Sequence, residues 1–362
     1  MKRSILLGLT GSVATVLYEK LIKELQTIGD VNVILTPAAE HFVPIEFTGV
    51  RIFRDIHEWS WVRDGVIDDK WKKEDSVLHI QLRNESSALV IAPCSANTLA
   101  KISHGICDNL LTTVARAWDL NRPFIIAPAM NTHMWEHPVT REHLGKFVNF
   151  SSNNHVFMPQ SKMLACKTQG MGAMGEISGI VEMLKEQLRW NFPLTKCSGI
   201  PSKNHPGSFL CKRKHHTHTG VDLYCDDGQI VRAVEDGTVV GIEHFTGPQD
   251  NSPWWNDTDC ILIEGASGVV CYGEVSIPNF IKIGTKVSRG RYIANVKRVL
   301  KEGKERPDIM GHSTSMLHME LYPHGKYTAF RERGPEVDSW NILNDPTQLL
   351  IEAYGSPSIL LT

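Results

Sequence analysis

The stretch SILLGLTGSVA, residues 4–14, decides the fold of the first half of the chain. Its residues 4–9 form a continuous apolar run, and Gly11 and Ser12 then open a helical pattern. The apolar positions of that pattern are Val13, Val16, Leu17, Leu21, Ile22 and Leu25. The same order of apolar run, turn and helical pattern recurs at VNVILT (31–36), ALVIAP (88–93) and FIIAPA (124–129). Because continuously apolar strands separated by helices are typical of a parallel sheet covered on both faces, we predict an α/β fold with a flavodoxin/Rossmann-like, doubly wound parallel sheet.

The pattern changes after residue 190. Residues 191–206 are rich in proline, glycine and small polar residues, which is typical of a linker. Beyond them, β-branched runs separated by Asp-Gly and Ser-Gly turns fill residues 229–245, 259–275 and 280–296. We therefore predict a doubly wound domain over 1–190, a linker over 191–206 and a mostly antiparallel β domain over 207–355.

The composition excludes several classes of protein. Lys and Arg number 38 against 40 Asp and Glu, and this balance argues against an extended nucleic-acid surface. No apolar run approaches the roughly 20 residues that span a bilayer. The apolar stretch after Lys2 and Arg3 is similar to a signal peptide, but Gly8 and Gly11 interrupt it. The 8 cysteines form no CxxC pair, which is typical of reduced thiols. We expect a cytoplasmic protein that binds neither nucleic acid nor a membrane.

Small polar residues follow three of the predicted strands. Gly11, Ser12 and Val13 follow the first, Ser95 to Thr98 the third, and Met130 and Asn131 the fourth. The carboxyl ends of parallel strands share one edge of a sheet, where ligands of this fold bind. Backbone N–H groups that open a helix suit a phosphate. A tight βα turn also uses glycine without any ligand, but three such strand ends together favour a ligand site.

Six motifs in order carry a resemblance to a known family. They are GSVA (11–14), LHIQL (78–82), PCSANT (93–98), GICDNLL (105–111), PAMNTHMW (128–135) and LAC with GMGAM (164–174). Over residues 4–190 the chain resembles the flavin-containing cysteine decarboxylases of the phosphopantothenoylcysteine decarboxylase type. The resemblance implies FMN-dependent decarboxylation of 4′-phosphopantothenoylcysteine to 4′-phosphopantetheine in coenzyme A biosynthesis. It also implies a homotrimer with active sites between subunits.

The resemblance implies a role for particular residues. His79 would be the catalytic base and Cys166 would protonate the enethiolate left after CO₂ departs. The substrate-binding residues would be Asn131, which holds the substrate carboxylate, with Met163, Leu164 and Ala165. The FMN-binding residues would be Gly11, Ser12, Val13, Thr36, Phe42, Ser95, Ala96, Asn97, Thr98 and Met130. Considered without the other motifs, His79 is also compatible with a histidine of the core, and Cys166 with a small apolar residue. Lys167 stands where relatives usually have Gly, which puts the final reduction in question.

The second half of the chain contains a candidate metal site. His218 and Asp222 are spaced as H-x-x-x-D, and His318 follows later within SMLHMELY (315–322). Two imidazoles and a carboxylate are a zinc set that leaves one position open for water. A pair of His216 with His218, or a histidine-rich loop without metal, are the alternatives.

Residues 207–330 resemble the lysostaphin-type zinc metallopeptidases, which implies Zn²⁺ at His218, Asp222 and His318. Two histidines that assist catalysis in that family are replaced here by Glu274 and Met316. We therefore expect a degenerate peptidase-like domain, although a Glu beside zinc can also act as a base.

Two other functions stay open for the whole chain. One is a non-catalytic regulatory or interaction protein built on the FMN-binding fold. The other is a zinc metallopeptidase that acts through the C-terminal domain.

Overall fold

A computed structural model describes residues 3–44, 49–63, 66–163, 169–213, 217–249, 252–304, 315–325, 343–355 and 360–361. The chain divides into two compact units, Lys2–Gln187 and Leu188–Thr362, which are described separately. Among the described residues, every helix is too short or too polar to cross a bilayer.

The N-terminal unit is built on a six-stranded parallel sheet. Its order is β3-β2-β1-β6-β7-β8, and every neighbouring pair is parallel. The strands are β1 (Arg3–Leu9), β2 (Gly29–Leu35), β3 (Arg51–Phe53), β6 (Ala88–Cys94), β7 (Phe124–Pro128) and β8 (Asn154–Val156). The four apolar runs of the sequence thus form β1, β2, β6 and β7, and the predicted doubly wound sheet is confirmed.

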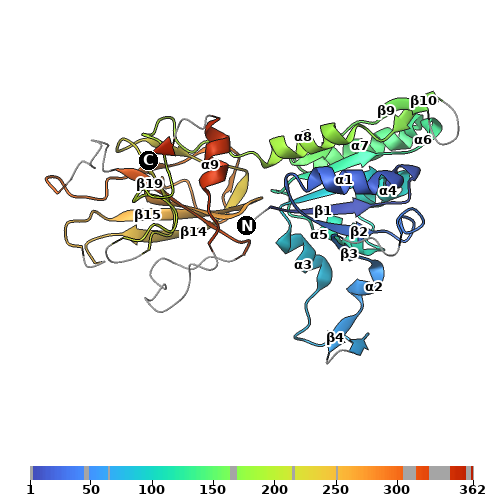
Figure 1. The fold of residues 1–362 in the computed structure, drawn as a ribbon, viewed down its shortest axis with the longest axis horizontal. Coiled ribbons are helices and arrows are strands. Elements are labelled where there is room, and N and C mark those ends of the chain that lie inside the picture. The colour runs from blue at the N-terminus through green and yellow to red at the C-terminus, as the bar shows by residue number, and fades with distance from the viewer. Residues whose placement is uncertain are drawn as a thin grey trace. The chain divides into compact units, whose positions relative to one another are not determined.

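Helices cover both faces of this sheet. Figure 1 shows α1 and α8 on one side of the strands and α3 and α5 on the other. The helices are η1 (Val13–Leu17), α1 (Tyr18–Leu25), α2 (Asp55–Glu58), α3 (Leu78–Glu85), α4 (Ala96–His104), α5 (Leu110–Ala117), α6 (Thr132–Glu136), α7 (Pro138–Phe150) and α8 (Ile177–Leu188). Two hairpins lie outside the sheet, β4 (Trp61–Arg63) with β5 (Val66–Asp68), and β9 (Gln160–Met163) with β10 (Gln169–Ala173).

The helix predicted from Val13 onward is in two pieces. A short 3-10 turn, η1, precedes α1, and only the positions on α1 that were expected to be apolar are buried: Leu21, Ile22 and Leu25. Val13, Val16 and Leu17 are 52%, 57% and 44% exposed. These three side chains therefore do not belong to the core of the unit.

The C-terminal unit is mostly antiparallel β-structure, as predicted. Its main sheet has the order β12-β19-β16-β15-β14-β17, with β18 pairing to both β13 and β16 (Figure 1). The strands are β12 (Val221–Tyr224), β13 (Ile230–Arg232), β14 (Gly237–Thr246), β15 (Thr258–Gly265), β16 (Gly268–Ser276), β17 (Lys286–Val287), β18 (Tyr292–Val296) and β19 (Met316–Tyr322). The short β11 (Ile200–Pro201) and β20 (Leu360–Leu361) pair with each other, and α9 spans Thr347–Tyr354.

The core of the C-terminal unit also includes residues from the segment read as a linker. Leu194 and Ile200 are buried together with Val221, Tyr272 and Leu317. Arg232 donates its backbone N–H to the carbonyl of Pro193. This part of residues 191–206 therefore packs within the second unit.

Candidate functional site

A cavity of about 910 Å³ opens at the carboxyl edge of the parallel sheet. It lies where β1, β2, β6 and β7 end, which is where ligands of doubly wound folds bind. The predicted cofactor residues that line it are Gly11, Ser12, Val13, Thr36, Ser95, Ala96, Asn97, Thr98 and Met130. The predicted substrate residues that line it are Asn131 and Met163.

Hydrogen bonds tie the turns of the cavity together. The Thr10 hydroxyl donates to the carbonyl of Pro93 at 2.7 Å and accepts from the backbone N–H of Ser95 at 2.9 Å. The Ser12 hydroxyl donates to the carbonyl of Ala129 at 3.3 Å. Since these bonds join the ends of β1, β6 and β7, the turns that follow these strands form one connected floor of the cavity.

The start of α4 faces the cavity. Ser95 caps this helix by accepting a hydrogen bond from the N–H of Thr98 at 3.2 Å, and Ala96 and Asn97 follow it. Unpaired N–H groups and the helix dipole make such an end attractive to an anion. The donors of this floor suit the phosphate and polar edge of a flavin mononucleotide.

Apolar side chains form the rest of the lining. Val13, Val16 and Leu17, which are exposed on η1, line this cavity together with Met134 and Met163. The helical pattern alone did not distinguish side chains that face a cavity from side chains that face the core. A wall of this kind suits a planar, largely apolar ring.

A close backbone approach explains the glycine of the first turn. A Cβ added at Gly11 would lie 2.5 Å from the Cβ of Ala38, closer than real Cβ contacts. Gly11 therefore keeps the ends of β1 and β2 together beside the cavity. The residues present fit an FMN site by both the donors and the shape of the turn.

Two of the predicted residues lie elsewhere in the unit. Phe42 does not line the cavity, and its backbone N–H donates to the carbonyl of Ala39. His79 is on α3, where its Nδ1 lies 2.5 Å from Oε1 of Glu58. The same Glu58 carboxylate accepts the backbone N–H of His79 at 3.1 Å. His79 is thus held in place but does not line the cavity of its own chain.

The remaining predictions for this site lie outside the described residues. They concern Leu164, Ala165, Cys166 and Lys167, between β9 and β10.

The cavity also contains charged residues that the sequence reasoning missed as site residues. Lys101 and Asp108 form an ion pair of 2.7 Å, and both line the cavity. Asp55 lines it as well and accepts the backbone N–H of Leu110 at 2.9 Å. These residues come from helices and loops rather than from strand ends, so the search at strand ends could not find them.

In the C-terminal unit, His218, Asp222 and His318 converge. Nε2 of His218 lies 3.0 Å from Oδ1 of Asp222 and 3.1 Å from Nδ1 of His318. Nδ1 of His318 lies 2.8 Å from the same Asp222 oxygen. All three residues are buried, and their ligand atoms lie within 4.8 Å of one another. The predicted metal set is therefore brought together by β12 and β19, where Asp222 and His318 are cross-strand partners.

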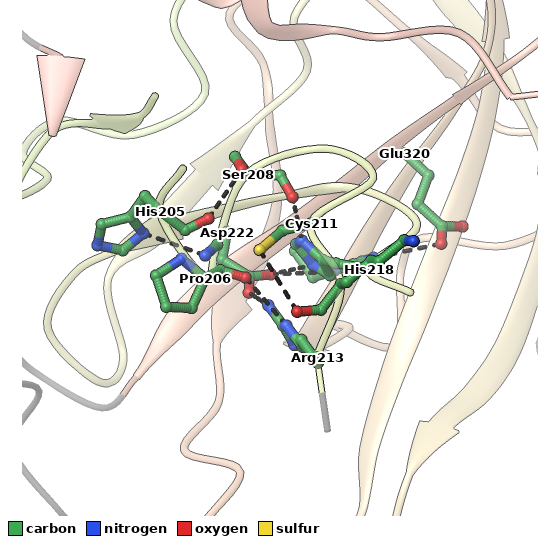
Figure 2. Close-up of polar contacts among 11 residues, drawn as sticks. His205, Pro206, Ser208, Cys211, Arg213, His218, Asp222 and Glu320 are labelled. Carbon is green, nitrogen blue, oxygen red and sulfur yellow. Dashed lines mark hydrogen bonds and ion pairs between the residues drawn. The ribbon is translucent and has the colours of Figure 1, made fainter. Parts of the chain in front are cut away.

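The outward atoms of these three residues have partners of their own. Figure 2 shows His218 beside Ser208, whose carbonyl lies 2.9 Å from Nδ1, and Arg213 beside Asp222. Nε2 of His318 lies 3.3 Å from Oε1 of Glu320. Metal-binding histidines and carboxylates are commonly oriented by outer partners of this kind. With neutral imidazoles the inward atoms are all acceptors, so a proton or a cation must lie among them.

The charges of the cluster follow from burial and pairing. Burial alone would lower the pKa of His318, but hydrogen bonds to Asp222 and Glu320 raise it to about 10. Burial lowers the pKa of His218 despite its contact with Asp222. Burial opposes ionisation of Asp222, yet its hydrogen bonds to both histidines hold its pKa well below the usual range. Without a cation, these shifts favour a protonated His318 beside an ionised Asp222.

Comparison with known proteins supports the assignment of the N-terminal unit. The Flavoprotein family model matches residues 1–189. Mouse phosphopantothenoylcysteine decarboxylase is 41% identical over 191 residues, which cover 52% of this chain and 88% of that protein. The soybean protein named phosphopantothenoylcysteine decarboxylase HAL3a is 43% identical over 187 residues, covering 51% and 83% respectively.

Solved structures are similar over the same share of the chain. A mutant phosphopantothenoylcysteine decarboxylase complexed with pantothenoylaminoethenethiol is 38% identical with a TM-score of 0.46, and covers 51% of this chain and 98% of that one. The FMN-binding protein AtHal3 is 39% identical with a TM-score of 0.45, covering 51% and 96%. On the family match and the sequence identity to the curated relatives, the chain belongs to the Flavoprotein family, among the relatives of the phosphopantothenoylcysteine decarboxylases.

Proposed function

We propose that the N-terminal unit decarboxylates 4′-phosphopantothenoylcysteine to 4′-phosphopantetheine with FMN, as a cytoplasmic step of coenzyme A biosynthesis. The observation that carries the proposal is the cavity at the sheet edge, which collects the predicted residues of three separate motifs, Ser12, Ser95 and Asn131 among them. Membership of the Flavoprotein family supports it.

The residues of the cavity have separate tasks in this proposal. The turn at Gly11 and the start of α4 at Ala96 would hold the phosphate and polar edge of FMN, and Met130, which also lines the cavity, would contact its ring. FMN supplies the redox chemistry that makes the carboxylate a leaving group. Asn131 accepts the N–H of Met134 at 2.9 Å through Oδ1, which turns its amide Nδ2 outward as a donor for the substrate carboxylate.

His79 acts as the base in this proposal, supplied to the cavity of a neighbouring subunit of a homotrimer. His79 does not line the cavity of its own chain, which agrees with a site between subunits. The contact of Nδ1 with Glu58 fixes the ring and leaves Nε2 for the substrate. Cys166, which lies between β9 and β10 in the sequence, donates the last proton.

The test is the visible spectrum of the purified chain, followed by CO₂ release from phosphopantothenoylcysteine. We expect a yellow protein with about one FMN per subunit and CO₂ release that is lost in His79→Asn. The variant should retain FMN, because the substitution changes none of the residues that are proposed to bind FMN. A colourless protein that takes up no FMN would refute the proposal.

A regulatory role is the alternative function for the same unit. Relatives carry HAL3 in their names alongside the decarboxylase name. A yellow protein with no CO₂ release from phosphopantothenoylcysteine would favour this alternative over catalysis.

For the C-terminal unit we propose a Zn²⁺ site made by His218, Asp222 and His318 in a lysostaphin-type, peptidase-like domain. The convergence of three buried ligand atoms, each with an outer partner, supports it. Metal analysis of the full chain should give one Zn²⁺ that is absent in His318→Ala. Equal metal content in both proteins would contradict the site.

A further inference from the structure

Glu274 lies in a β-bulge beside the cluster of His218, Asp222 and His318. On β15 and β16, Asp259 pairs with Val275 and Ile261 pairs with Tyr272, so two residues of β16 stand opposite one of β15. Glu274 is one of those two, and its φ of +62° is in the left-handed region that favours glycine. Bulges re-aim a side chain, and backbone strain of this kind is concentrated at functional sites.

The carboxyl group of Glu274 has an unusual environment. Its Oε2 is buried and has no hydrogen-bond partner among the described residues. Gly273, its neighbour in the bulge, is the cross-strand partner of His318. Because Glu274 follows Gly273 directly, it lies beside the cluster, where burial and then the charge of Asp222 raise its pKa and the charges of His318 and Arg213 lower it. A buried acceptor without a partner calls for a donor that the protein itself does not supply.

Glu274 is not itself one of the converging ligands. The three atoms within 4.8 Å of one another belong to His218, Asp222 and His318 alone. Three protein ligands leave a zinc-type cation one open position, which water takes. The water at that position has two O–H groups and needs an acceptor.

We propose that Glu274 is the acceptor for a water molecule bound at the open position of the cation site. Oε2 of Glu274 takes the hydrogen bond and then the proton, while the electron pair of the broken O–H bond stays on the water oxygen. The inference rests on the proposed Zn²⁺ site and deepens it, because it gives the C-terminal unit a means of activating water. This role explains why the bulge has Glu at a position where the positive φ favours Gly.

The test uses Co²⁺ as a spectroscopic probe in the full chain, with azide as a ligand for the open position. Burial and the negative charge of Asp222 raise the pKa of Glu274 to about 8, so the titration is made at pH 8.5, where an ionised Glu274 facing that position repels the azide anion. Glu274→Gln should therefore bind one Co²⁺ like the natural protein but bind azide at least tenfold more tightly, about 1.4 kcal/mol. Glu264→Gln removes the same charge from β15, away from the cluster, and should leave azide binding unchanged.

A second variant distinguishes loss of the carboxylate from misfolding. Glu274→Gly relieves the positive φ and should unfold at the same or a higher temperature, while also binding azide at least tenfold more tightly. Azide affinities of both Glu274 variants within twofold of the natural protein would overturn the role of Glu274 and leave the cation site standing. A natural chain that binds no Co²⁺ would overturn the site and the role together.

Discussion

Gly11→Ala offers a direct test of how the first turn shapes the FMN cavity. The added Cβ would lie 2.5 Å from the Cβ of Ala38, so the turn after β1 or the turn after β2 must move. Overpacking of this kind costs about 1–3 kcal/mol. Because the strain falls on residues that line the cavity, we expect most of it as lost FMN affinity, a factor of about 5 to 150 at roughly 1.4 kcal/mol per tenfold.

The assay is fluorescence titration of the FMN-free chain with FMN. The matched control is Gly145→Ala on α7, where nothing lies within 4 Å of an added Cβ. This control should bind FMN normally and gain up to about 1 kcal/mol of stability, because Ala is the better helix former. The double variant Gly11→Ala with Ala38→Gly removes the clash and should recover FMN affinity.

Two results would refute the reasoning. If Gly11→Ala bound FMN as tightly as the natural chain, the close approach of the two turns would not shape the cofactor site. If the double variant failed to recover affinity, the loss in the single variant would come from something other than the contact with Ala38.

Three further predictions concern stability, catalysis and pH. Phe147→Ala should lower the free energy of unfolding of the N-terminal unit by about 3–5 kcal/mol in a denaturant titration, because the ring is fully buried and packs edge-on against Phe124 at 4.9 Å. Cys166→Ser should still release CO₂ from phosphopantothenoylcysteine but accumulate the unreduced enethiol, detected by mass spectrometry; normal 4′-phosphopantetheine would remove Cys166 as the proton donor. In the cation-free chain the pKa of His318 is raised to about 10, above the value of about 6.5 for a histidine in the unfolded chain. Its proton therefore stabilises the fold fully below about pH 6.5, and this contribution is lost as the pH rises through 10. A cation must displace that proton, so Zn²⁺ affinity measured against a chelator should rise about tenfold from pH 6.5 to 7.5; a constant affinity would contradict this.

The sequence was sufficient to predict the layout of both halves of the chain. The apolar runs at residues 4–9 and 88–93 became the adjacent strands β1 and β6 of one parallel sheet, and the β-branched runs beyond 229 became antiparallel strands. Such patterns are local, because a strand that is buried on both faces has apolar residues at consecutive positions. For the same reason the sequence predicts that the small residues after each strand, Ser12 and Ser95 among them, lie at one edge of the sheet.

The sequence did not determine which side chains meet across the chain. The helical pattern predicts that Val13 and Leu17 face the core, but they line the cavity. Periodicity identifies an apolar face of a helix and does not say whether that face contacts the core or a cavity. Lys101 reaches the same cavity from within a helix, and His79 stays away from it.

In the second half, the sequence analysis named His218, Asp222 and His318 as one ligand set, and the pairing of β12 with β19 brings His318 to Asp222. The bulge that holds Glu274 in a strained conformation is likewise a product of strand register. Register depends on the packing of whole sheets, whereas composition and spacing act over a few residues. The sequence alone thus determined the two folds and the candidate ligand types, and the tertiary structure decided which groups share a site.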